Sequence, residues 1–295
     1  MQQRTQGALL VMLAALCWGV AGGMGGLLID KGWHPLVASF YRGAVGLLFV
    51  LVWLALHPQG SGLGNPRLWL WSGLAGLGVA GNFSFYFLSI EAGSLPVAAT
   101  LMYSAPVFVY LVSFGLGLEK PTLLKGAAIA LVLTGIVLLT GLYRAGPGGM
   151  TGLGIAAGLL AGLSYSLFIF GFKYASEVGS PPASLAIAFA VLVVVLSLPA
   201  GPAQALAVLD SPDWPLFTVL GLLGGGISFA FYVRGLAPTA PTVASILAMV
   251  EPVTASLFGV VVLGAHLESP QLLGMALVLV TVTALSIHSS RQPAS

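Results

Sequence analysis

Long apolar segments alternate with short polar ones along the whole chain. A helix needs about 20 residues to cross a bilayer core about 30 Å thick, and the apolar segments reach that length. Turn residues, charges and Pro/Gly clusters separate them. The predicted membrane spans cover residues 7–29, 35–56, 67–89, 95–117, 122–142, 150–174, 182–200, 213–235, 240–263 and 270–288. The loops are too short for a soluble domain, so we expect the protein to work within the membrane or at its faces.

Basic residues are unevenly distributed over the short loops. The side of the N-terminus would carry Arg4, Arg67, Lys120, Lys125, Lys173, Arg234 and Arg291, and the other side only Lys31 and Arg144. Because Lys and Arg are retained on the cytoplasmic side, this bias predicts that both termini are cytoplasmic. The first apolar run continues to about Leu28, beyond signal-peptide length, and is expected to stay as the first span. A loop-poor, charge-biased chain of this kind is typical of a bacterial inner membrane.

The chain is similar to itself when shifted by roughly half its length. Leu16-Cys17-Trp18 aligns with Leu163-Ser164-Tyr165, Pro106-Val107 with Pro252-Val253, and Leu118-Glu119-Lys120-Pro121 with Leu267-Glu268-Ser269-Pro270. We therefore predict two five-helix halves, 1–147 and 148–295. Five is odd, so the second half must be inverted in the membrane. Secondary transporters commonly have such repeats, with the substrate site near the midplane between them.

Composition narrows the classes of function. Hydrophobic residues make up 58% and charged residues only 6% of the chain, against about 25% charged residues in a soluble domain. The Lys and Arg residues are scattered and the net charge is only +2, which excludes a nucleic-acid binder. The lone Cys17 excludes an intramolecular disulfide and a cysteine-based metal cluster. We predict neither a metal nor another cofactor.

Several motifs resemble those of the drug/metabolite transporter superfamily. They run from Gly93-Ser94-Leu95-Pro96 through Ala105-Pro106-Val107 to Leu118-Glu119-Lys120-Pro121, and recur from Ala240 through Glu251-Pro252-Val253 to Leu267-Glu268. Arg42 also stands where such proteins often carry an arginine in the second helix. The chain is most similar to the ten-helix EamA-type members, including bacterial exporters of aromatic and other amino acids. The resemblance implies an all-α polytopic fold, with ten helices around a central cavity. Spans four and nine lack the lysines of the sugar-phosphate branch, so phosphorylated substrates are not expected.

Two ionisable residues, Arg42 and Glu251, lie deep in apolar spans. A charge at the bilayer centre costs about 2.5–3.5 kcal/mol on insertion scales, so each needs a partner or a polar cavity. One hypothesis makes Glu251 a site for a proton or a substrate ammonium, and Arg42 an anchor for a carboxylate. The other pairs them, or satisfies them with backbone carbonyls, as a structural lock between the halves.

Prolines and glycines predict features of the helices. Pro106 and Pro252 would free the carbonyls of Met102 and Ala248, either as hinges or as static bends. Small residues four apart predict close helix packing, at Gly22/Gly26, Gly154/Gly158/Gly162 and Gly221/Gly225.

Polar and aromatic side chains within the spans are candidates for the cavity wall, and we expect about half of them to reach it. Together with Arg42 and Glu251, the candidates are Trp18, Asn82, Tyr86, Tyr103, Ser104, Tyr110, Tyr165, Ser228, Tyr232 and Ser245.

The pattern favours a secondary transporter that exports neutral, including aromatic, amino acids and similar metabolites by alternating access. Its partners would be a small-molecule substrate and the lipid bilayer, with no nucleic acid, and it would be a monomer or a weak homodimer. Efflux of lipophilic cations bound by Glu251 is an alternative, and a passive channel stays open. An intramembrane enzyme is disfavoured, because motifs such as His-Glu-x-x-His are missing from the sequence.

Overall fold

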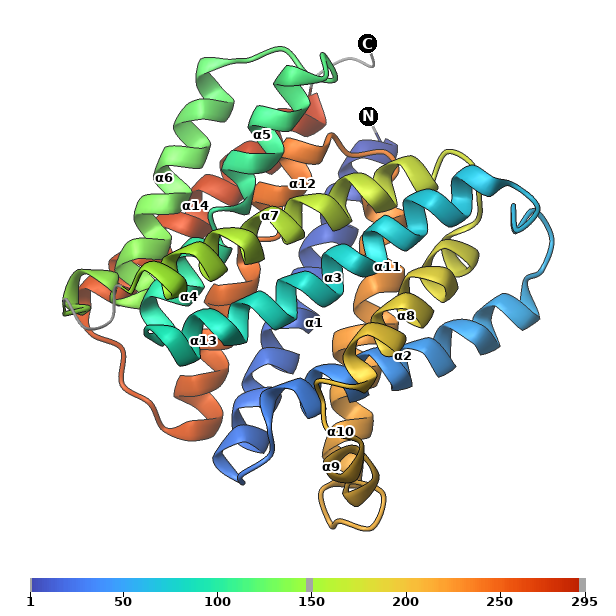
Figure 1. Ribbon diagram of the computed structural model, residues 1–295. Coiled ribbons are helices and arrows are strands. Elements are labelled where there is room, and N and C mark those ends of the chain that lie inside the picture. Colours follow the sequence, from blue (N-terminus) through green and yellow to red (C-terminus); the bar gives the residue numbers. More distant parts are fainter. Residues whose placement is uncertain (1, 147–150, 292–295) are drawn as a thin grey trace.

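The computed structural model describes residues 2–146 and 151–291, which form a bundle of helices (Figure 1). Nine spans within these residues are long and apolar enough to cross a membrane. A tenth apolar helix, Pro181–Ser197, has 17 residues. The helices are α1 Gln2–Asp30, α2 Pro35–Leu56, α3 Pro66–Ala92, α4 Leu95–Met102, α5 Ala105–Gly115, α6 Leu123–Thr140, η1 Leu142–Arg144, α7 Gly152–Ala175, α8 Pro181–Ser197, α9 Pro202–Ala207, α10 Trp214–Gly221, η3 Leu222–Ile227, α11 Ser228–Leu236, α12 Pro241–Leu247, α13 Val250–Leu263 and α14 Ser269–Arg291.

The helix boundaries follow from local chemistry. Side chains of His34, Asn65, Thr122, Thr151 and Ser180 accept a backbone N–H at the starts of α2, α3, α6, α7 and α8, as N-cap residues do. The predicted span 182–200 is too long, because α8 ends at Ser197. Leu198 still has helical backbone angles, but Pro199 after it has no N–H to continue the helical hydrogen bonds. The predicted division at 147/148, and residue 150 of the predicted sixth span, lie outside the described residues.

Helices of each half pack against helices of the other half. In the first half, α3 packs against α7 and α8, and α4 against α7. The second half mirrors this arrangement, because α11 and η3 pack against α1, η3 and α10 against α2, and α13 against α1. The equivalent pairs α2/α8 and α6/α14 contact each other directly. This exchange confirms two inverted five-helix repeats, and both ends of the described chain lie at the same side of the bundle (Figure 1). We call this the terminal side.

The fourth and ninth spans are interrupted in the same place. The first breaks between Met102 and Ala105, and the second between Leu247 and Val250. The prediction that Pro106 and Pro252 lie inside continuous helices is therefore wrong. Each proline lies in the first turn of a new helix, where a missing N–H loses no helical hydrogen bond. The carbonyl of Ala248 is not left free either, since it accepts the backbone N–H of Glu251 at 2.9 Å.

The eighth span contains a π-helical turn, η3, that the sequence analysis did not predict. Its glycines allow α2 to come very close. A Cβ atom on Gly225 would lie 2.1 Å from the carbonyl oxygen of Arg42, and one on Gly224 would lie 2.7 Å from Arg42 Nε. Turns of this kind occur frequently at functional sites, and here the turn lies directly behind Arg42.

Candidate functional site

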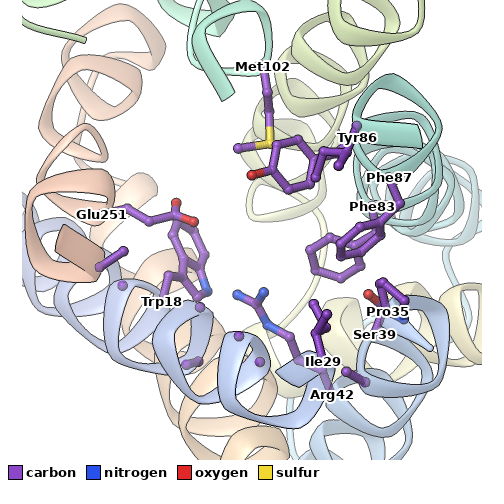
Figure 2. Close-up of a pocket in the computed structure, with 18 of the residues that line it drawn as sticks. Trp18, Ile29, Pro35, Ser39, Arg42, Phe83, Tyr86, Phe87, Met102 and Glu251 are labelled. Carbon is purple, nitrogen blue, oxygen red and sulfur yellow. The ribbon is translucent and has the colours of Figure 1, made fainter. Parts of the chain in front are cut away.

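A cavity of about 500 Å³ lies among α1, α2, α3, α4 and α13 (Figure 2). Its mouth is formed by the ends of these helices at Ile29, Asp30, Pro35, Ile90 and Leu95, on the side away from the termini. We call this the opposite side. The volume falls in the range of about 300–1,000 Å³ found for small-molecule sites. The described residues contain no group of three His, Cys, Asp or Glu side chains that could hold a metal ion.

One wall of the cavity is aromatic. Phe83, Tyr86, Phe87 and Ile90 line it from α3. Their spacing places them along one helix face. Met102 of α4 adds a flexible apolar side chain above them (Figure 2). This wall suits an apolar or aromatic part of a ligand.

Glycines of α1 form the facing wall. Gly22, Gly25 and Gly26 line the cavity, and a Cβ atom added to any of them would meet nothing within 4 Å. The prediction that Gly22/Gly26 mark a close helix contact is therefore wrong, because these glycines widen the cavity. The prediction holds elsewhere: a Cβ atom on Gly158 would lie 2.8 Å from the side chain of Leu101, and η3 makes the close contact with α2 described above.

Arg42 is half-buried and reaches the cavity from α2. Its Nε donates to the carbonyl oxygen of Gly224 at 2.8 Å. Its guanidinium carbon lies 4.9 Å from the ring centre of Phe83. One backbone carbonyl thus satisfies one donor and orients the group. The terminal N–H groups of the guanidinium point into the cavity (Figure 2), where they can bind a carboxylate in a bidentate manner.

Glu251 faces the same space from the first turn of α13 (Figure 2). Tyr103, at the break in the fourth span, lies beside it. Arg42 and Glu251 attract each other electrostatically. The ion pairs within 4 Å in the described part of the chain do not include this one. The direct ion pair is therefore not made in this conformation. The hydrogen bond from Arg42 to Gly224 does join the two halves through a backbone carbonyl, as the structural hypothesis allows.

The predicted candidates fall into two groups. Those that line the cavity are Trp18, Arg42, Asn82, Tyr86, Tyr103 and Glu251. Six others, Ser104, Tyr110, Tyr165, Ser228, Tyr232 and Ser245, do not line it. Ser245 is fully buried and donates to the carbonyl oxygen of Thr242 at 2.8 Å. Sequence reasoning missed Ser39, Phe83, Phe87 and Met102, although the helical spacing of Phe83 with Tyr86 and Phe87 was available as a signal.

The floor of the cavity is a cluster of aromatic rings. The ring of Trp18 lies 4.9 Å from that of Tyr232 and 5.0 Å from that of Phe229, between centroids. Phe168 packs edge-on against Trp18. A void of about 20 Å³ beside these rings has Trp18, Arg42, Tyr165 and Glu251 among its lining residues. The floor separates the open cavity from the terminal side.

Polar contacts hold the terminal side closed. The Lys173 ammonium, at the end of α7, donates to the carbonyl oxygens of Leu236, Ala237 and Thr239 at 3.2, 2.6 and 3.1 Å. Glu119 accepts the backbone N–H of Thr242 at 3.1 Å and forms an ion pair with Lys125. On the terminal side, these contacts join the end of the sixth span to the end of the eighth, and the fourth span to the start of the ninth.

A different contact lies at the opposite side. Lys31, after α1, forms an ion pair with Asp213 before α10, and Trp33 Nε1 donates to Asp213 Oδ2 at 2.9 Å. Hydrogen bonds from Lys31 and then Trp33 lower the pKa of the Asp213 carboxyl. Because the pair joins the α1–α2 loop to the start of α10, it leaves the mouth open.

A second cavity, of about 580 Å³, lies between α2 and the η3–α11 segment. Its lining is apolar except for Arg234, whose guanidinium carbon lies 4.5 Å from the ring centre of Trp53. Ligand sites normally combine apolar walls with several converging polar groups. The central cavity is therefore the candidate functional site.

Two inverted repeats that enclose a central cavity, open to one side and closed to the other, are typical of membrane transporters. The comparisons agree with this class. The model of the EamA-like transporter family matches the chain twice, over residues 5–141 and 152–287, so the protein belongs to this family.

Two relatives of the chain are uncharacterized transporters. It is 23% identical over 292 residues to the uncharacterized transporter YwfM of Bacillus subtilis, covering 97% of this chain and 95% of that protein. It is 30% identical over 203 residues to an uncharacterized transporter of Archaeoglobus fulgidus, covering 67% and 69% of the two chains. A solved crystal structure shares the fold with a TM-score of 0.74 at 19% identity, over 97% of this chain and 99% of the other.

Proposed function

We propose that this EamA-family transporter is an alternating-access carrier of neutral amino acids, including aromatic ones. The observation that carries the proposal is the pair Arg42 and Glu251, which face one cavity without touching. A zwitterion placed between them would bind its carboxylate to the guanidinium and its ammonium to Glu251. Its side chain would then contact the aromatic wall of α3.

The same geometry weighs against the other candidate functions. A lipophilic cation would gain from Glu251 but would be repelled by Arg42, because both charges face the same cavity. A passive channel needs a continuous polar path, and the aromatic floor around Trp18 interrupts it. A carrier needs a closed side of this kind.

The charge bias of the loops supports a direction of transport and a location for the protein. We place both termini in the cytoplasm of a bacterial inner membrane, since the terminal side has most of the Lys and Arg residues. The cavity would then open to the exterior, which is the state that releases an exported substrate. One chain forms the whole cavity, so a monomer would suffice for transport.

The test is counterflow of labelled phenylalanine in proteoliposomes, with competitors that lack one charge each. Phenylalanine amide keeps the ammonium only, and N-acetylphenylalanine keeps the carboxylate only. We expect phenylalanine to compete far better than either in the wild type. Relative to phenylalanine, the amide should compete better in Arg42→Gln than in the wild type, and the N-acetyl compound should compete better in Glu251→Gln.

The same proteoliposomes distinguish a role of Glu251 in proton coupling from a role in substrate binding. Efflux that is stimulated by a proton gradient in the wild type but not in Glu251→Gln would make Glu251 the coupling residue. Transport of a lipophilic cation such as tetraphenylphosphonium without transport of any amino acid would overturn the proposal in favour of cation efflux. Equal competition by all three phenylalanine compounds would refute recognition of both the carboxylate and the ammonium of the substrate.

A further inference from the structure

The third and eighth spans have matching residues around the cavity. Phe83-Ser84-Phe85-Tyr86 aligns with Phe229-Ala230-Phe231-Tyr232, 146 positions later in the sequence. Asn82 therefore corresponds to Ser228 and Tyr86 to Tyr232, while Trp18 corresponds to Tyr165 in the first and sixth spans.

The two sets of residues have different environments. Asn82, Tyr86 and Trp18 line the open cavity. Their second-repeat counterparts do not line it. These counterparts are buried, with exposed fractions of 0% for Ser228 and Tyr232 and 3% for Tyr165, and Trp18 and Asn82 are buried as well, at 2% and 5%. Within the described residues, none of these three hydroxyl groups has a hydrogen-bond partner.

An unpaired buried hydroxyl is unusual and unfavourable, at about 1–3 kcal/mol each. Three such hydroxyl groups lie in one region, on two neighbouring helices, and their presence requires an explanation. Phenylalanine and alanine would fill the same space without this penalty. In a protein that opens to both sides, the reason is the other conformation, in which these groups face a cavity and find partners.

We propose that Tyr165, Ser228 and Tyr232 form a hydroxyl-lined half-site that binds the charged end groups of the substrate when the carrier opens to the terminal side. This inference rests on the proposed carrier function. The small void beside Trp18 reaches both Tyr165 and the pair Arg42 and Glu251. A substrate at this pair would therefore move from the Asn82/Tyr86 surface to the Ser228/Tyr232 surface as the opposite side closes and the terminal side opens.

Cysteine labelling tests the position of the half-site without knowledge of the substrate. In a Cys17→Ser background, Ser228→Cys is exposed to a membrane-impermeant maleimide from either face of oriented proteoliposomes. Gly22→Cys is the matched control, because its position faces the open cavity with space for a side chain. We expect labelling of Gly22→Cys from the opposite side, and labelling of Ser228→Cys from the terminal side only.

Two results would overturn the half-site. One is labelling of Ser228→Cys from the opposite side. The other is no labelling from the terminal side, even with a saturating amino acid and Lys173→Met, while Gly22→Cys reacts normally. Sided labelling without transport of any amino acid would keep the half-site and reject the substrate class instead.

Tyr232→Phe and Tyr86→Phe test the role of the hydroxyl groups. Each removes one oxygen atom and keeps the ring. We expect Tyr232→Phe to raise the half-saturating phenylalanine concentration about tenfold from the terminal side and not from the other, as loss of about 1.4 kcal/mol implies. Tyr86→Phe should do the reverse. Equal effects on both sides would show a structural role only and would overturn binding by the hydroxyl groups.

Discussion

Replacement of Arg42 by lysine is the sharpest test of the central site, because it keeps the positive charge and removes the planar guanidinium group. Lysine has no Nε–H to donate to Gly224 at 2.8 Å and no planar group to lie over Phe83. Its ammonium must either bond that carbonyl or face the cavity. A charge-assisted hydrogen bond is worth about 1.5–3 kcal/mol, so substrate affinity should fall about 10- to 150-fold at about 1.4 kcal/mol per tenfold.

The assay is equilibrium binding of labelled phenylalanine to purified protein, with thermal unfolding measured on the same samples. Arg234→Lys is the matched control, since Arg234 is exposed and contacts Trp53 outside the central cavity. It should bind phenylalanine as the wild type does. An Arg42→Lys protein that folds and binds within twofold of the wild type would refute the reasoning.

Two further predictions concern stability. Gly225→Ala should lower the melting temperature, because its Cβ would lie 2.1 Å from the Arg42 carbonyl oxygen, and such overpacking costs about 1–3 kcal/mol. Gly25→Ala, which meets open space, should leave it unchanged. Asp213→Asn should destabilise the protein by the same small amount between about pH 6 and pH 8. The lowered pKa of Asp213 keeps its carboxylate paired with Lys31 above the ordinary value of about 3.9, and the difference should shrink only below it. A difference that changes across the neutral range would contradict this assignment.

The spans, their number and the repeat could be predicted from the sequence, because each depends on local composition. An apolar stretch of bilayer length forms a helix in almost any arrangement, since lipid leaves the backbone no other partner. The inverted pairing followed from the odd number of spans in each half. The charged residues of the site were also visible, because Arg42 and Glu251 stand out in apolar surroundings.

The interruptions and the π turn could not be predicted in this way. Pro106 and Pro252 mark the breaks, but a proline is compatible both with a kink inside a helix and with the first turn of a new one. Which of these occurs depends on tertiary packing. The same holds for η3, where three successive glycines permit a close contact with α2 that no local pattern requires.

The open side of the cavity was equally hidden in the sequence. The two repeats have similar residues at equivalent positions, so the pattern predicts two equivalent cavities and not which of them is open. Tyr165 and Ser228 were expected at the cavity as polar side chains within spans, yet in this conformation they lie behind the floor. A few contacts without a counterpart in the other repeat decide which side of the protein is open.

Lys173 makes one such contact. Its counterpart in the first repeat, 147 positions earlier, is Gly26, which has no group to donate to carbonyls at the end of α3. Glu119 is similar, because the residue equivalent to its partner Thr242 is Pro96, which has no backbone N–H. The terminal side therefore has two polar latches that the opposite side lacks.

Lys173→Met should accordingly shift the carrier toward opening at the terminal side. Methionine keeps much of the aliphatic length and removes the ammonium, which has three carbonyl partners. Because Lys173 is only half-buried, we assign the latch about 1–2 kcal/mol in total, a 5- to 30-fold change in population. The labelling rate of Ser228→Cys from the terminal side should rise by that factor, and that of Gly22→Cys from the opposite side should fall only if the open state ceases to dominate. Lys120→Met, which removes an exposed ammonium from the same side, should change neither rate. An unchanged Ser228→Cys rate in Lys173→Met would mean that the aromatic floor around Trp18, and not the ammonium, keeps the terminal side shut.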